Sequence, residues 1–133
     1  MLVNSNPPGW APIESPDGKS IYFIDTRGTD FSNHGVWRIP LERGEPKQVI
    51  DSLAYTGIDY AVKDDGIYFI SRSDPARGYC IRFLELATGK INTIAELGKL
   101  SCSDLTVSPD LHWALYAQTE QSGSDLMLVE NFK

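Results

Sequence analysis

The sequence predicts an all-β fold, a partial β-propeller of about three four-stranded antiparallel blades in which the last blade is incomplete. A tight turn followed at once by an apolar strand occurs three times, at Ser15–Phe23, Lys63–Ile70 and Ser108–Tyr116. The aspartates of these turns are 48 and 45 positions apart, which is the period of a propeller blade. Gly and Pro punctuate the chain at short intervals, and no stretch has a convincing helical period.

The second strand of each repeat is apolar at successive positions, as IYFID, IYFIS and ALYAQ. A sheet with one wet face would alternate apolar and polar residues, so these strands should be covered on both faces. We expect eleven strands, which is more than the seven to nine of the usual β-sandwich. Stacked blades are therefore favoured over a sandwich or a small barrel.

The first unit spans about residues 10–50. Its hairpin turn is Ser15-Pro16-Asp17-Gly18, because Pro presets φ, Asp bonds its own backbone and Gly accepts a positive φ. Residues 26–35 form a long polar loop, and residues 42–45 form a turn. The expected strands are 10–14, 20–25, 36–42 and 47–50.

The second unit, about 57–95, repeats this order with Asp64-Asp65-Gly66 as its hairpin turn. Lys63-Asp64 stands where the first turn has Ser-Pro. Residues 73–78 form the loop, and Ala87-Thr88-Gly89-Lys90 is the last turn. The expected strands are 57–62, 67–72, 79–86 and 91–95.

The third unit, about 104–132, has strands at 105–108, 113–118 and 124–131, and a fourth strand is missing. Leu111 stands where the first turn has glycine, so either that turn changes type or Leu111 accepts a strained positive φ. The aromatic residues on the expected strands of the three units should pack between blades: Trp10, Tyr22, Phe23, Trp37, Tyr68, Phe69, Trp113 and Tyr116. The three units form a single domain over residues 1–133.

Two stretches, Trp10–Lys19 and Val36–Pro46, resemble the repeat of WD-repeat-like β-propellers of the TolB type. The resemblance implies the carboxyl-terminal propeller portion of a larger bacterial protein. In such relatives the propeller often follows a winged-helix DNA-binding domain and a membrane segment, or a kinase domain. No signal peptide is visible in the chain. The resemblance implies a periplasmic location if the parent is exported or membrane-anchored.

The composition disfavours two partner classes. The chain has 12 Lys and Arg against 18 Asp and Glu, a formal net charge of -6. Such a surface repels phosphate backbones and anionic headgroups, so we expect no nucleic-acid partner and no membrane contact. No apolar run approaches the roughly 18 residues that a bilayer span needs.

No catalytic or metal chemistry is expected. The acidic residues Asp17, Asp64, Asp65 and Asp110 suit turns and lack the spacing of a calcium loop. His34 and His112 are too few for a zinc site, and His34 is read as a solvated loop residue. No G-x-S-x-G motif occurs. The chain is therefore expected to be no enzyme and to carry no cofactor or metal.

The two cysteines leave the redox state open. Cys80 falls on an expected strand and Cys102 in an expected connection, with no CxxC spacing. They could form a disulfide, but two partly buried free thiols are favoured.

Long loops and blade-to-blade connections should meet at one end of the propeller, where binding residues commonly lie. Arg suits carboxylate recognition, and Phe or Tyr can anchor a peptide. The candidate partner-binding residues are Arg27, Asp30, Phe31, His34, Tyr55, Arg72, Asp74 and Arg77.

We therefore expect a non-catalytic scaffold that binds a protein or peptide, as the sensing or docking portion of a larger bacterial regulator. The alternative is a propeller accessory to a prolyl-oligopeptidase-like hydrolase. A carbohydrate-binding or lyase propeller has no supporting cluster of residues. Three open blades expose an unpaired edge and end faces. A homodimer of about six blades is thus expected, in which Leu2–Ser5 could fill the vacant strand position of its partner.

Overall fold

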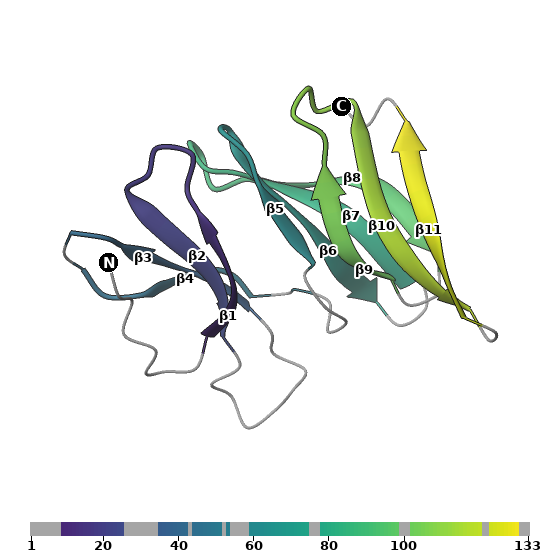
Figure 1. The fold of residues 1–133 in the computed structure, drawn as a ribbon, viewed down its shortest axis with the longest axis horizontal. Helices are drawn as coiled ribbons and strands as arrows, with labels where there is room; N and C mark the ends of the chain where they lie inside the picture. Colours follow the sequence, from purple (N-terminus) through teal and green to yellow (C-terminus); the bar gives the residue numbers. More distant parts are fainter. Residues whose placement is uncertain are drawn as a thin grey trace.

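The computed structural model describes residues 9–25, 35–42, 44–51, 53, 59–74, 78–98, 102–120 and 123–130. These residues form eleven strands and no helix. Within the described ranges there is accordingly no helix that could cross a membrane. The strands form three separate sheets that stand side by side in chain order (Figure 1).

Every sheet is antiparallel, and its strands are hydrogen-bonded in the order in which they follow along the chain. Blade A contains β1 (Gly9–Glu14), β2 (Ser20–Asp25), β3 (Gly35–Pro40) and β4 (Lys47–Ile50). Blade B contains β5 (Tyr60–Val62), β6 (Gly66–Asp74), β7 (Gly78–Glu85) and β8 (Ile91–Gly98). Blade C contains β9 (Cys102–Val107), β10 (Trp113–Glu120) and β11 (Gly123–Glu130). The all-β class and the three-stranded last blade are confirmed.

Several strand ends differ from those expected. The strand β6 continues to Asp74, because Arg72 pairs with Tyr79 and Asp74 with Gly78. The ladder uses backbone groups, so polar side chains do not end it. The strand β9 begins at Cys102, which therefore lies on a strand and not in a connection. In the first strand of blade B only 60–62 is a described strand.

Blade B is covered on both faces, as its consecutive apolar residues predict. On β6, Ile67 and Phe69 belong to the apolar cluster between blades A and B. Tyr68 and Ile70 belong to the cluster between blades B and C. Because side chains alternate across a strand, four successive apolar residues supply two interfaces.

Aromatic packing between blades is confirmed for most of the expected residues that the structure describes. Tyr22 and Phe69 are buried in the A–B cluster, and Tyr68 and Tyr116 in the B–C cluster. Three residues differ: 37% of the surface of Trp113 is exposed, and Phe23 and Trp37 belong to neither inter-blade cluster.

The first strands of successive blades are tied by side-chain hydrogen bonds. The Tyr60 hydroxyl of β5 donates to the Ala11 carbonyl of β1. The backbone N–H of Asp104 on β9 donates to Oδ1 of the buried Asp59, at 3.3 Å. These bonds join positions 49 and 45 residues apart and so fix neighbouring blades against one another.

Cys80 is a buried free thiol, so the disulfide with Cys102 is not formed. Its Sγ lies 3.6 Å from the Ser71 carbonyl oxygen, to which it donates. A thiol held in this way behaves as a small apolar residue of the core.

Candidate interaction surface

The hairpin turn of blade A is held by its own side chains. The Ser15 hydroxyl donates to Oδ1 of Asp17 at 2.6 Å and accepts the Ser20 N–H at 3.0 Å. The same carboxylate oxygen accepts the Lys19 N–H at 2.9 Å. Gly18 completes the turn with φ of +71°, a conformation that costs glycine little.

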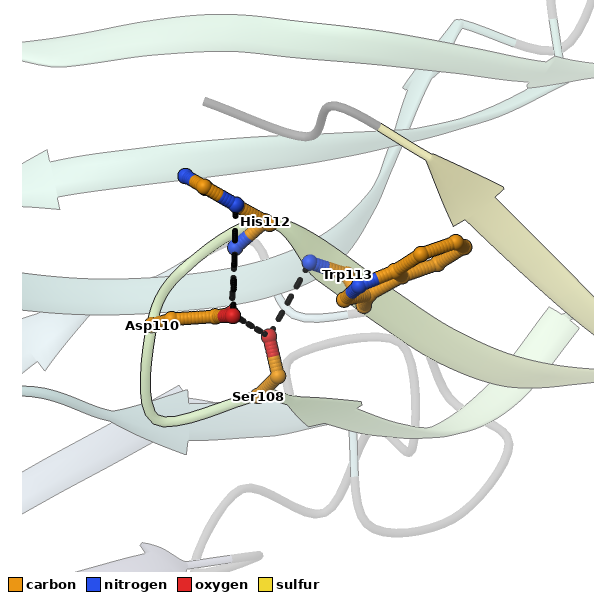
Figure 2. A network of polar contacts seen from close by, with 4 residues as sticks. All are labelled: Ser108, Asp110, His112 and Trp113. Atoms are coloured by element: carbon orange, nitrogen blue, oxygen red, sulfur yellow. Dashed lines mark hydrogen bonds and ion pairs between the residues drawn. The ribbon is translucent and has the colours of Figure 1, made fainter.

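Blade C repeats this network (Figure 2). The Ser108 hydroxyl donates to Oδ1 of Asp110 at 2.6 Å and accepts the Trp113 N–H at 3.0 Å, and Oδ1 accepts the His112 N–H at 3.0 Å. Leu111 has φ of +64°. The turn type is thus kept and Leu111 takes the strained conformation, at a cost of about 1 kcal/mol.

Hydrogen bonding explains the acidity of both turn aspartates. The hydroxyl of Ser15 and then the N–H of Lys19 lower the pKa of Asp17 below its ordinary value. The hydroxyl of Ser108 and then the N–H of His112 lower the pKa of Asp110 in the same way. The turn role of these two aspartates is confirmed. Among the described residues, no group of three His, Cys, Asp or Glu side chains could hold a metal ion.

Two open hollows lie beside these turns. The first has a volume of about 460 Å³ and is lined by residues of all three blades: Pro16, Val62, Lys63, Asp64, Asp65, Pro109 and Leu111. The second, of about 400 Å³, lies between blades A and B and is lined by Ser15, Pro16, Asp17, Tyr22, Arg38, Asp64 and Leu86. Such mixed and open linings suit weak polar contacts better than burial of an apolar ligand.

The structure does not test whether the predicted partner-binding residues come together. Six of them, Arg27, Asp30, Phe31, His34, Tyr55 and Arg77, lie outside the described residues. Arg72 and Asp74 lie at the end of β6 and not in a loop, and only their backbone is described. The loop-end site therefore stays a prediction.

A different surface stands out, which we call the leading face of blade C: Trp113, Leu115, Ala117, Leu126 and Leu128. The register pairs Leu115 with Leu128 and Ala117 with Leu126, and residues that are directly opposite in a sheet share one face. Leu126 is 71% exposed and Leu128 is 56% exposed. Figure 1 shows β11 at the far side of the molecule from blade A.

Exposure at this face contrasts with the equivalent positions of the other blades. The register pairs Ile24 with Val36, Ile70 with Ile81 and Ala117 with Leu126. The third-strand residue of each pair holds the same place in the repeat. Val36 and Ile81 are both fully buried. Leu126 is exposed because, among the described residues, no further sheet packs against blade C.

The edge of blade C differs in the same way. The third strands of blades A and B, β3 and β7, have a paired strand on each side. In the described part of the chain β11 pairs with β10 alone. An eight-residue edge strand offers a row of backbone donors and acceptors to another chain. The sequence predicted both the missing fourth strand and an exposed end face. It did not single out Leu126 and Leu128 as residues of that face, although their alternation along the strand was a signal.

The described fold is similar to solved β-propellers. TolB from Acinetobacter baumannii superposes with a TM-score of 0.69 at 18% identity, over 91% of this chain and 29% of that chain. A chain of the nidogen/laminin complex superposes with a TM-score of 0.56 at 13% identity, over 84% of this chain and 40% of that one. The chain thus spans less than half the length of either.

No family model matches the sequence, and no curated protein matches it. At these identities the likeness shows the fold: a TolB-like β-propeller of three blades, the last with three described strands.

Proposed function

We propose that the chain is a non-catalytic β-propeller module that binds a protein or peptide and that pairs with a second copy of itself when no other partner is present. The observation that carries this proposal is the leading face of blade C. Its Leu126 is 71% exposed in the place that the buried Val36 and Ile81 hold in the other blades, and Leu128 on the same face is 56% exposed. Contiguous exposed apolar surface of this kind marks interaction sites.

The charge of the chain supports a protein partner over other classes. A formal net charge of -6 disfavours nucleic acids and anionic lipids, whereas an apolar sheet face suits another folded protein. One of the similar structures is that of the nidogen/laminin complex, and another is that of TolB from the bacterium Acinetobacter baumannii. A docking role within a larger bacterial regulator agrees with both.

Self-association is tested by light scattering and sedimentation velocity over a range from sub-micromolar to about 100 μM protein. The expected result is a concentration-dependent shift from one chain to two. A single chain at every concentration, with an unchanged folded-state spectrum, would refute the pairing.

The eight loop-end residues remain part of the proposal as a second, peptide-binding surface. A displayed library of random peptides is panned against the wild-type chain and against an Arg27→Ala/Phe31→Ala/Tyr55→Ala variant. The expected result is enrichment of peptides that bind the wild type and lose binding to the variant. The matched control is the Lys90→Ala variant, altered in a short turn at the end of blade B. Peptides that bind all three proteins equally would rule out the loop-end surface.

A further inference from the structure

We infer that two copies of this chain assemble head to tail, with the leading face of blade C in one copy packed against the outward face of blade A in the other. The inference rests on the proposed self-association and adds which surfaces meet. Two observations support it: the blades are repeats of one another, and equivalent positions in different blades differ in exposure.

Each blade packs against the next in the same sense. In the A–B interface, Tyr22 and Ile24 of β2 meet Ile67 and Phe69 of β6. In the B–C interface, the equivalent Tyr68 and Ile70 of β6 meet Ala114 and Tyr116 of β10. Each second strand carries four successive apolar residues, at 21–24, 67–70 and 114–117. The second and fourth of them form what we call a leading face, and the first and third form a trailing face.

This rule assigns the two end faces of the chain. The outward face of blade C is a leading face, so its natural complement is a trailing face. The outward face of blade A is a trailing face, which carries Ile21 and Phe23 on β2 and Trp37 and Ile39 on β3. One chain therefore presents both halves of the same type of interface, on opposite ends.

Blade A retains accessible apolar surface on its trailing face. Ile21, Trp37 and Ile39 are each half-buried, and Phe23 is buried. The register pairs Ile21 with Ile39, as it pairs Ile67 with Leu84 in blade B. Leu84 is 6% exposed and belongs to the A–B cluster, so a partner blade would bury Ile39 in the same manner.

One residue of this trailing face departs from the pattern. The register places Glu14 beside Ile21, where blades B and C have Val62 and Val107. Glu14 is exposed and lies next to the hairpin turn, where its Oε1 would be 3.3 Å from a Cβ on Gly18. A charge there weakens the interface, and Glu14→Val should strengthen it.

Head-to-tail contact makes two equal interfaces when the ring closes. Two copies of three sheets give six blades, which is within the range of known propellers. A face-to-face pairing of two leading faces would instead leave both trailing faces uncovered. Heterologous contacts close into a ring only at the right rotation, and otherwise they form open filaments.

The first experiment breaks each face separately. Leu126→Glu/Leu128→Glu changes the leading face of blade C, and Ile39→Glu changes the trailing face of blade A. Each should raise the dimer dissociation constant at least about 30-fold in sedimentation equilibrium. The matched control is Ile91→Glu/Ile94→Glu, two exposed isoleucines of β8 that belong to neither face, which should leave the constant unchanged. Circular dichroism establishes that each variant is folded.

The second experiment mixes the two broken variants. A leading-face variant and a trailing-face variant still share one intact interface, so the mixture should form a heterodimer although neither variant dimerises alone. If Ile39→Glu still dimerises like the wild type, the leading faces pair with each other and the head-to-tail arrangement is wrong. If Ile39→Glu does not fold, Glu14→Val decides the question: at least about threefold tighter dimerisation is expected, and no change overturns the inference.

The outcomes separate the inference from the proposed function. A wild-type chain that is monomeric at all concentrations refutes both self-association and this arrangement. If the wild-type chain dimerises and every trailing-face variant dimerises with the same dissociation constant, the arrangement alone is refuted. Filaments in place of dimers show that the contacts do not close, which also overturns it.

Discussion

Two equivalent positions in different blades should respond very differently to the same truncation. Ile81 on β7 is fully buried, whereas Leu126 on β11 holds the same place in blade C and is 71% exposed. Truncating a fully buried aliphatic side chain to alanine costs about 3 kcal/mol, because it removes apolar contacts and leaves a cavity. Truncating an exposed one costs about 0.5 kcal/mol or less.

Urea unfolding followed by tryptophan fluorescence measures both variants. Each is made in a Leu128→Glu background, so that unfolding reports on a single chain. With a urea dependence of about 1.5 kcal/mol per molar, Ile81→Ala should lower the unfolding midpoint by about 2 M, and Leu126→Ala by about 0.3 M or less. Equal shifts would refute the argument, because they would mean that blade C is covered like blade B.

Other predictions concern the turns and one tight contact. Gly66→Ala should destabilise the fold by about 3 kcal/mol in urea unfolding, because the new Cβ would lie 2.1 Å from the Leu84 carbonyl oxygen; a smaller loss than about 1 kcal/mol would contradict this. Because the folded-state pKa values of Asp17 and Asp110 lie below 3.8, their stabilisation is present above that pH and is lost as pH falls through the folded values. In thermal melts, the melting temperature of the Asp17→Asn/Asp110→Asn variant should therefore change less with pH below 3.8 than that of the wild type. An unchanged slope of melting temperature against pH would refute the linkage. Ser108→Ala should cost about 1 kcal/mol in the same melts, and a cost equal to zero would show that its two hydrogen bonds are dispensable.

The blade architecture was predictable because its determinants are local. Pro16, Asp17 and Gly18 specify a turn by backbone preference and side-chain hydrogen bonding. The serine and aspartate of blade C make the same bonds even where Leu111 replaces glycine. The consecutive apolar residues of β6 required two covered faces, and the structure supplies both.

Strand ends and the residues that form the exposed face were less predictable, for physical reasons. The strand β6 continues to Asp74 because ladder hydrogen bonds do not depend on side chains. Three open blades predict exposed end faces, but the strands β10 and β11 carry the apolar pattern of an enclosed blade, so the sequence does not single out Leu126 as a residue that faces solvent. The expected loop-end site falls on residues that the structure does not describe or describes by backbone only, and sequence remains its sole support.

The pattern of β10 and β11 also supports the proposed partner at blade C. Ala114 and Tyr116 on one face of β10 are buried against blade B, while Leu115 and Ala117 on the other face remain half-buried. A sheet meant to face water would be polar at alternate positions. Blade C is instead apolar on both faces, as blade B is, and blade B lies between two neighbours. The same strand chemistry therefore supports the proposed second neighbour at blade C, and the trailing face of blade A is a described surface of the type that the proposal needs.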